Sequence, residues 1–228
     1  MMDSERLRVY LSSLEQTPSP LIQEIEAHAA ANFVPIIRRE TAALLKTLVA
    51  MKQPKEILEV GTATGYSALR MCEALRKDGK ITTIEKYEKR IPIARKNFQR
   101  AGEEDRITFL TGDAAEVLKT LAGPYDFIFM DAAKGQYLSF LPEVLRLLPE
   151  GGVLLTDNVF QDGTLLESRY AVCRRDRTIH ARLRDYLYEL KHREDLLTSV
   201  VPIGDGVTVS VKILPEKKGT SEENHEET

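Results

Sequence analysis

The sequence lacks any long apolar segment, and it also lacks an apolar leader. Its longest apolar runs, such as 127–130 and 152–155, are far shorter than the roughly 20 residues of a membrane helix. The first ten residues, MMDSERLRVY, are charged from Asp3 onward and contain no apolar signal region. These absences argue against a membrane span and against secretion, and they predict a cytoplasmic location without a membrane partner.

Metal sites built from cysteine or histidine are also unsupported. The two cysteines, Cys72 and Cys173, lie far apart and have no metal-type spacing, which excludes a disulfide framework and a thiolate zinc site. The histidines show no ligand spacing either, and we assign no role to them: His28, His180, His192 and His225.

What the sequence does contain is the composition of an ordinary globular domain. Hydrophobic residues make up 43% and charged residues 29% of the 228 residues, a length that one α/β domain can reach without dividing. Residues 1–53 read as amphipathic helices: Pro18 and Pro20 suit the opening turn of the second helix, and Pro35 ends its pattern. We therefore predict a single domain over 1–214, with N-terminal helices in 1–53 and a cofactor-binding sheet in 54–214. The remaining residues, 215–228, are predicted to form a disordered acidic tail.

Beyond Lys55, short β-rich runs alternate with helical stretches. The runs EILEV, KITTI, RITFL, DFIFM and GGVLLT are each followed by a helical pattern, the first over 66–77 and the last, after a loop, near Arg182 to Lys191. Strands such as FIFM and VLLT are continuously apolar, as expected of parallel strands with helices on both faces, so an α/β doubly wound Rossmann-like sheet is predicted. The last two runs flank Gly204-Asp205-Gly206 and predict a C-terminal β-hairpin at one sheet edge.

The turn after the first strand predicts a ligand site, because ligands bind beyond the carboxyl ends of such strands. Gly61 and Gly65 allow a sharp turn and a close approach of the backbone to a ligand, next to the start of a helix. The glycines are four residues apart, unlike the G-x-G-x-x-G pattern of dinucleotide folds, so nicotinamide or flavin is disfavoured.

Two further strand ends carry candidate ligand contacts. Glu85 follows the second strand at a distance suited to ribose hydroxyls, and Gly112-Asp113-Ala114 follows the third, where an adenine ring would lie. Each feature alone is more often a plain turn or a solvated acid. In this order, strand-GxxxG-helix, strand-Glu and strand-GDA, they resemble the class I S-adenosylmethionine (SAM) methyltransferases.

That resemblance implies SAM as cofactor and assigns contacts to it. Glu59, Gly61 and Ser67 are expected around the methionine part, Glu85 at the ribose, and Asp113 with Ala114 at the adenine. The same family pattern brings the backbone near Ile37, and also Asp131, to the cofactor.

Hard oxygen ligands follow the fourth and fifth strands. Asp131 ends one, and Asp157-Asn158 ends the other, so three oxygen donors are expected at one rim. Such a set suits Mg²⁺, or Mn²⁺ or Ca²⁺, and not structural zinc. The alternative is that Asp131 caps the next helix and that Asp157-Asn158 forms an ordinary turn.

Lys134 favours the metal interpretation. With Asp131 three residues before it, DAAKGQY resembles the corresponding motif of the metal-dependent catechol and caffeoyl-CoA O-methyltransferases, over roughly Pro35 to Leu214. The resemblance implies Asp131, Asp157 and Asn158 as metal ligands, and Lys134 as the general base, with Asp131 counted as catalytic. A cation there would act as a Lewis acid on two adjacent acceptor oxygens, and it would favour the neutral form of the lysine.

Three hypotheses about the partner stay open. The segments FVPIIRRETAALL, GTATGYSALRM and RRDRTIHARLRDYLYEL resemble the bacterial tRNA 5-hydroxyuridine methyltransferases, which implies a tRNA anticodon stem-loop. Five arginines could contact its phosphates: Arg38, Arg39, Arg174, Arg175 and Arg177. The alternative is that these arginines form a solvated helix face, or salt bridges with Glu40, Asp176 and Asp185. The second hypothesis is a catechol-like small molecule, and the third a non-catalytic RNA-binding protein of the same fold, which the intact metal motif disfavours.

Three tyrosines are candidates for stacking on a base or a catechol, although aromatic residues at such positions are more often core residues: Tyr66, Tyr137 and Tyr170. The family resemblance also implies a homodimer with the N-terminal helices near the partner.

Overall fold

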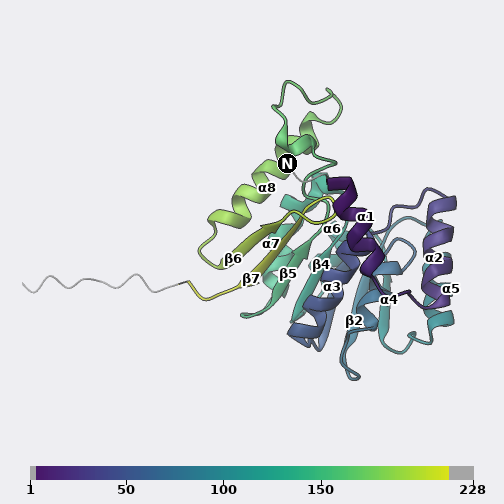
Figure 1. The fold of residues 1–228 in the computed structure, drawn as a ribbon. Helices are drawn as coiled ribbons and strands as arrows, with labels where there is room; N and C mark the ends of the chain where they lie inside the picture. The colour runs from purple at the N-terminus through teal and green to yellow at the C-terminus, as the bar shows by residue number, and fades with distance from the viewer. Residues whose placement is uncertain (1–3, 216–228) are drawn as a thin grey trace, which may run out of the picture.

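A seven-stranded sheet lies at the centre of the molecule (Figure 1). The structure is a computed structural model, and it describes residues 4–215. The strand order is β3-β2-β1-β4-β5-β7-β6. The strands are β1 (Glu56–Val60), β2 (Lys80–Glu85), β3 (Ile107–Thr111), β4 (Phe127–Met130), β5 (Val153–Thr156), β6 (Leu196–Val201) and β7 (Val207–Lys212). The first five are parallel, and β7 pairs antiparallel with both β5 and β6. The predicted doubly wound sheet and C-terminal hairpin are thus confirmed.

Helices cover both faces of this sheet. One face packs against α2 (Pro20–Ala31), α3 (Arg39–Lys52), α4 (Tyr66–Cys72) and α5 (Ile91–Ala101), and α1 (Ser4–Leu14) contacts α3. The other face packs against α6 (Ala114–Thr120), α7 (Tyr137–Leu147) and α8 (Arg177–His192). Two short 3₁₀ helices, η1 (Lys134–Gln136) and η2 (Thr164–Leu166), lie in the connections before α7 and α8.

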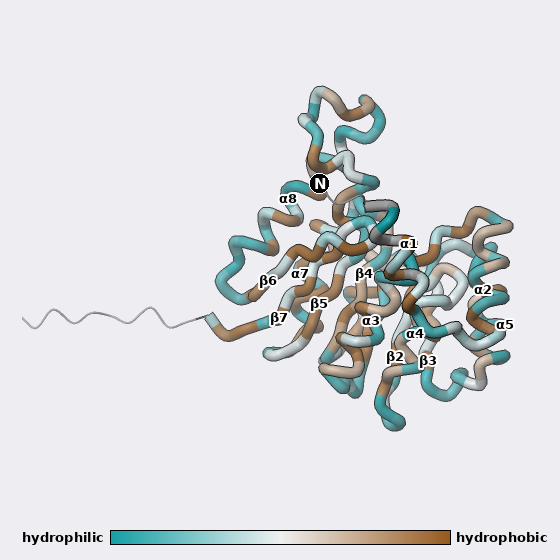
Figure 2. Tube along the Cα trace, viewed as in Figure 1, coloured by the Kyte–Doolittle hydropathy of each residue, from teal (hydrophilic) through white to brown (hydrophobic). Residues whose placement is uncertain are grey.

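The central strands are apolar throughout because each contributes to two separate cores. Along β1, Ile57 belongs to the core under α2–α5, whereas Leu58 and Val60 belong to the core under α6–α8. All four residues of β4 and of β5 are buried. Figure 2 shows this as hydrophobic segments along the central strands. With period-two side-chain alternation and helices on both faces, no position on these strands faces water.

Local signals set several element ends. The Ser19 hydroxyl accepts a hydrogen bond from the Ile22 amide and Pro20 occupies the first turn, so α2 begins where the sequence indicates. By contrast, α4 ends at Cys72 instead of running on to residue 77. The amides of Ala74 and Leu75 both donate to the Met71 carbonyl, and this tightens the chain into turns before β2. Helix α8 starts at Arg177, ahead of the predicted start near Arg182.

Among residues 4–215, no helix is long and apolar enough to span a membrane. The helices predicted in 1–53 are present as α1, α2 and α3. Most of the tail predicted to be disordered, residues 216–228, lies outside the described residues.

Candidate active site

A cavity of about 800 Å³ opens at the carboxyl ends of the parallel strands. Its wall contains residues that follow β1, β2, β3, β4 and β5 in turn: Gly61, Glu85, Asp113, Ala114, Asp131, Lys134 and Asn158. The residues predicted from separate strand ends therefore share one site, because parallel strands deliver their carboxyl ends to the same rim.

Gly61 permits the close approach of two strand ends. Its φ is +106°, and a Cβ built there would lie 2.1 Å from the Asp131 carbonyl oxygen. Neither the backbone angle nor the space admits another L-residue. The close contact with Asp131, which follows β4, thus requires glycine at position 61.

Glu85 presents its carboxylate at the cavity wall in a fixed position. One oxygen accepts the Ala63 amide at 2.8 Å, and the other accepts the amides of Lys86 at 2.9 Å and Tyr87 at 2.7 Å. The side chain is buried, and the oxygen that accepts the Ala63 amide can accept a further hydrogen bond. An acceptor-only group held this way suits vicinal hydroxyls such as those of a ribose.

Asp113 links the cavity to the start of α6. One carboxylate oxygen caps the helix by accepting the Ala115 amide at 2.9 Å, and the other lies 3.1 Å from the Lys86 amine. The Ala115 hydrogen bond and then Lys86 hold the pKa of Asp113 below its usual value. The group therefore stays ionised beside Ala114, which lines the same wall.

Glu59 and Ser67 lie behind the wall and do not line it. The fully buried Glu59 accepts hydrogen bonds from the hydroxyls of Ser67 and Thr83, each at 2.5 Å. Burial raises the pKa of Glu59 to about 7, against the opposing effect of these two hydrogen bonds. These two hydrogen bonds join β1 to α4 and to β2 next to the glycine turn. The predicted contact of Glu59 and Ser67 with the methionine part remains a prediction.

The segment before α3 reaches the cavity close to Ile37, whose predicted backbone contact with the cofactor stays a prediction. Pro35 and Ile36 line the wall, whereas the Ile37 side chain is buried in the core under α2–α5. Which of two adjacent apolar residues faces a cavity depends on the local rotation of the chain, and the residue pattern does not encode it.

Asp131, Asp157 and Asn158 meet at the cavity rim. The Asn158 side-chain amide donates to Asp131 at 3.0 Å and to Asp157 at 3.2 Å. Asn158 adopts a left-handed backbone with φ of 60°, a conformation that asparagine tolerates. Asp131 does not cap the next helix, because the residue that precedes η1 is Ala133.

Burial disfavours the ionised forms of Asp131 and Asp157. Burial raises the pKa of Asp131 to about 6. Burial, and then the charge of Asp131, raise the pKa of Asp157 to about 7. Within residues 4–215, no three His, Cys, Asp or Glu side chains gather as a metal site, so a cation here would depend on the Asn158 oxygen as its third protein ligand.

Lys134 also lies at this rim, where it contacts Asp205, a partner that the sequence does not indicate. Its amine is 3.0 Å from a carboxylate oxygen of Asp205, in the turn between β6 and β7. Gly204-Asp205-Gly206 signals only a hairpin turn in the sequence. No local pattern indicates that its acid faces inward.

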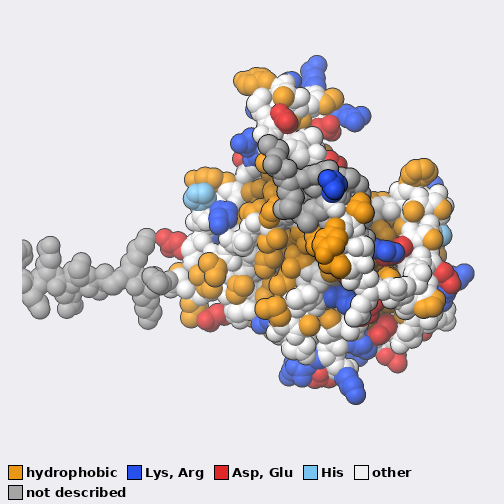
Figure 3. Space-filling model, viewed as in Figure 1, with side chains coloured by type: hydrophobic (Ala, Val, Ile, Leu, Met, Phe, Trp, Pro, Cys, Tyr) orange, Lys and Arg blue, Asp and Glu red, His pale blue; other side chains and the backbone are white. Residues whose placement is uncertain are grey.

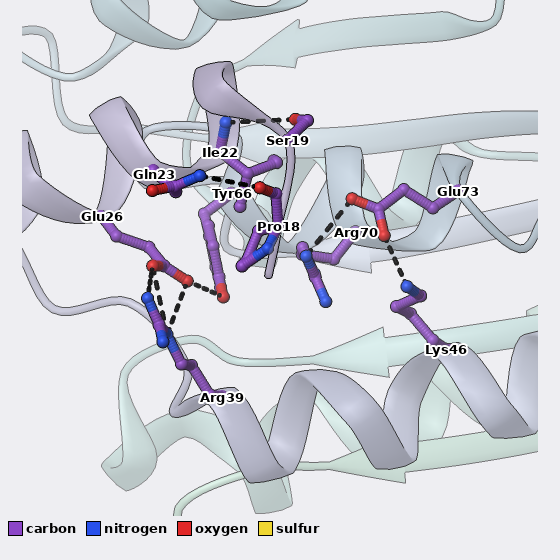
Figure 4. A network of polar contacts seen from close by, with 10 residues as sticks. All are labelled: Pro18, Ser19, Ile22, Gln23, Glu26, Arg39, Lys46, Tyr66, Arg70 and Glu73. Carbon is purple, nitrogen blue, oxygen red and sulfur yellow. Dashed lines mark hydrogen bonds and ion pairs between the residues drawn. The ribbon is translucent and has the colours of Figure 1, made fainter. Parts of the chain in front are cut away.

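The arginines predicted to contact RNA have different environments. Arg39 is paired with Glu26 of α2, which also accepts the Tyr66 hydroxyl (Figure 4). Arg177 donates to the carbonyls of Val172 and Tyr170 and so braces the preceding loop.

The remaining three arginines are exposed. Arg38 donates to the Gly204 carbonyl at 3.3 Å and lies 3.9 Å from the Asp162 carboxylate. Arg174 and Arg175 are exposed, and Arg175 makes a 3.5 Å contact with Asp176, one of the predicted alternatives. Of the three tyrosines, Tyr66 and Tyr137 are buried, whereas Tyr170 is 88% exposed.

The parallel sheet and the cavity at its rim are those of a Rossmann-like methyltransferase. A model of the O-methyltransferase family matches residues 12–213, and the chain belongs to this family. It is 40% identical over 127 residues to a catechol O-methyltransferase of Niastella koreensis. That match covers 54% of this chain and 58% of the relative, so the chain spans less than two thirds of that protein's length.

Two further comparisons extend over most of the chain. A caffeoyl-CoA O-methyltransferase of Eucalyptus gunnii is 30% identical, with 93% of this chain and 90% of that protein covered. The O-methyltransferase TomG of Streptomyces achromogenes, solved in complex with SAM, has a TM-score of 0.81 at 25% identity. It covers 94% of this chain and 100% of TomG.

Proposed function

We propose that this protein transfers the methyl group of SAM to an acceptor oxygen with the help of a divalent cation, and that the acceptor is 5-hydroxyuridine at the wobble position of tRNA. The observation that carries the chemistry is the single cavity shared by Glu85, Asp113, Asp131 and Asn158. It is large enough for a nucleoside-sized cofactor beside an acceptor.

The residues at the rim fit a hard divalent cation. Asp131, Asp157 and the Asn158 side-chain oxygen are the donor types that Mg²⁺ and Mn²⁺ prefer. Asp157 is buried and Asp131 is half-buried, so the charges of these neighbouring carboxylates need compensation, to which the Asn158 amide contributes hydrogen bonds. A bound cation would supply Lewis acidity toward two neighbouring acceptor oxygens.

Residues of the chain itself then bind the methyl donor and accept the proton. Glu85 and Asp113 hold the methyl donor, whose sulfonium supplies the methyl group. Lys134 accepts the proton of the acceptor hydroxyl, and the oxygen takes the methyl carbon as the carbon–sulfur bond breaks. Holding donor and acceptor in one enclosed cavity provides much of the rate enhancement through orientation.

Support for an RNA acceptor comes from the loop between β5 and α8. This chain segment begins at the cavity wall with Asn158 and Asp162 and projects from the body of the molecule (Figure 1). Arginine and apolar side chains lie on this projection, together with acidic ones (Figure 3). The exposed Arg174, Arg175 and Tyr170 are residue types that contact phosphates and stack on unpaired bases.

The alternative acceptor is a small catechol-like molecule, which the name of the Niastella koreensis relative favours. Both acceptors offer two adjacent oxygens. We expect methyl transfer from labelled SAM to tRNA isolated from a strain lacking the gene, and none to a panel of catechols. Transfer to catechols with none to tRNA would refute the RNA acceptor and leave the methyltransferase chemistry standing.

A matched pair of variants tests the loop arginines directly. Replacing Arg174 and Arg175 with alanine should raise the KM for tRNA and reduce its salt slope by about 1 for each lost phosphate contact. The control replaces Lys77 and Lys119, exposed residues away from the cavity, and should leave both quantities unchanged. Equal behaviour of the two double variants would exclude these arginines from tRNA binding.

We also propose that two copies of the chain associate through the outer face of β6, β7 and α3. Figure 3 shows hydrophobic side chains gathered over these elements. No helix covers this part of the sheet among the described residues, and the apolar side chains there stay partly exposed: Leu44, Leu48, Leu197, Val201, Val209 and Val211. Patches of this kind mark protein interfaces.

Light scattering should therefore give twice the chain mass. Leu197→Asp should shift the protein to the monomer, because Leu197, on the edge strand β6, is 66% exposed on this face. Leu166→Asp, on the projecting loop, changes a leucine that is 79% exposed and should leave the dimer intact. A monomeric wild-type protein would contradict the proposal.

A further inference from the structure

Asp205 is buried although it lies in a hairpin turn. It is 7% exposed, between two glycines with φ of 60° and 77°. A Cβ at Gly204 would lie 2.4 Å from the Thr41 hydroxyl, and one at Gly206 would lie 2.4 Å from the Phe160 ring. The turn is thus packed against α3 and against the segment after β5. Turn acids are ordinarily solvated, so a buried one needs compensating partners.

Both carboxylate oxygens of Asp205 have such partners. One lies 3.0 Å from the Lys134 amine, and the other accepts the Asp162 amide at 2.6 Å. The backbone of the turn adds two bonds, from the Phe160 amide to the Asp205 carbonyl and from the Val159 amide to the Gly206 carbonyl. One residue therefore joins Lys134 to the segment that directly follows Asp157 and Asn158.

We propose that Asp205 is a positioning residue that fixes the amine of Lys134 for proton transfer. A free lysine side chain samples many rotamers, and holding it in one of them costs conformational entropy. A hydrogen bond from the neutral amine to a carboxylate that is itself anchored in the turn keeps the amine at the cavity rim before the acceptor arrives. This inference rests on the proposed role of Lys134 as the base.

The contact also fits the charge change during the reaction. When the acceptor O–H bond breaks, its proton moves to the lysine nitrogen, and the oxygen forms a bond to the methyl carbon while the carbon–sulfur electrons return to sulfur. The lysine becomes an ammonium next to the Asp205 carboxylate. The carboxylate thus stabilises the protonated lysine as it forms, and a neutral group at position 205 would not.

Asp205→Asn removes this effect with little change in shape. An amide has one acceptor oxygen, whereas two donors, the Lys134 amine and the Asp162 amide, face position 205. A change in stability alone does not separate positioning from a structural role. A double-mutant cycle with Lys134→Met does, because residues that act through each other have non-additive effects.

The cycle is measured with labelled SAM and Mg²⁺, using tRNA or 3,4-dihydroxybenzoate, whichever accepts methyl groups in the comparison above. We expect Asp205→Asn to lower kcat at least tenfold, with unchanged KM and unchanged affinity for S-adenosylhomocysteine. In the Lys134→Met background, the same substitution should change kcat less than twofold. Asp195→Asn breaks an ion pair with Arg193 at the start of β6 and should leave kcat unchanged in both backgrounds.

The outcomes separate the two proposals. If Asp205→Asn lowers kcat by the same factor with and without Lys134, its role is structural and the inference fails. An unchanged kcat in the single Asp205→Asn variant overturns it as well. If Lys134→Met alone retains full kcat, the proposed base is wrong, and with it the positioning of that base by Asp205, while methyl transfer itself is unaffected.

Discussion

Asp157→Ala is expected to abolish methyl transfer while the protein still binds SAM. Asp157 lies at the end of β5, is 2% exposed and is not part of the cavity wall. Its loss leaves Asp131 and Asn158 as the remaining oxygen donors, too few for a tightly held cation. Activity should fall by more than about 100-fold, beyond the 10–100-fold typical of losing a group that only supports a metal ligand.

The fold should tolerate this substitution. The Tyr137 hydroxyl donates to the main-chain carbonyl of Asp157, at 3.1 Å, and that bond does not depend on the side chain. Removing Asp157 also relieves the repulsion that helps to raise the pKa of this group to about 7. The measurements are transfer of label from SAM with and without Mg²⁺, and calorimetric titration with S-adenosylhomocysteine.

Asp126→Ala provides the control for removing a carboxylate elsewhere in the sheet. Asp126 lies just before β4, at the opposite end from the cavity, where it accepts the amides of Lys55 and Glu56. That variant should lose stability but keep metal-dependent activity. Turnover by purified Asp157→Ala without added metal would show that the proposed use of the cation is wrong.

The architecture was predictable because it depends on local patterns repeated along the chain. A strand covered on both faces must be apolar at every position, and FIFM and VLLT meet that condition visibly. Once strands of this kind alternate with helices, the chirality and spacing rules bring every carboxyl end to one rim. Asp131 and Asn158 could therefore be placed together from sequences 27 residues apart.

Contacts between elements that are distant in the sequence were not predictable in the same way. Lys134 and Asp205 are 71 residues apart, and the sequence around Asp205 indicates only a turn. Arg39, a candidate for RNA contact, is paired with Glu26 of α2, and the residues around Arg39 do not indicate this partner. A charged side chain has the same local pattern whether it faces solvent or a partner from another element. Only tertiary placement decides between the two.

Glu59 illustrates a third limit. Its position at the end of β1 indicates nearness to the glycine turn that follows, but the alternation along the strand directs its side chain to the core under α2–α5. Ser67 and Thr83 then satisfy both of its carboxylate oxygens. A residue can thus belong to a functional turn and still support the site from behind the wall.

Among substitutions that add one methyl group, we expect Gly61→Ala to have the largest effect on stability or on methyl transfer. The new Cβ would lie 2.1 Å from the Asp131 carbonyl oxygen, a backbone atom that cannot move without shifting the end of β4. The φ of +106° adds backbone strain of about 1–3 kcal/mol. Either the protein loses stability, or the end of β4 moves and carries Asp131 out of its position beside Asn158.

Gly102→Ala is the matched control, because Gly102 also has a positive φ, +69°, but a Cβ there meets nothing within 4 Å. It tests strain without a clash and should lower Tm by about 2–4 °C for a cost of about 1 kcal/mol in a chain of this size. We expect Gly61→Ala to lower Tm at least three times as much, to be insoluble, or to lose methyl transfer. A Gly61→Ala protein with the Tm of Gly102→Ala and full activity would contradict the close approach of β1 and β4 at the cavity, and with it the geometry from which the site is built.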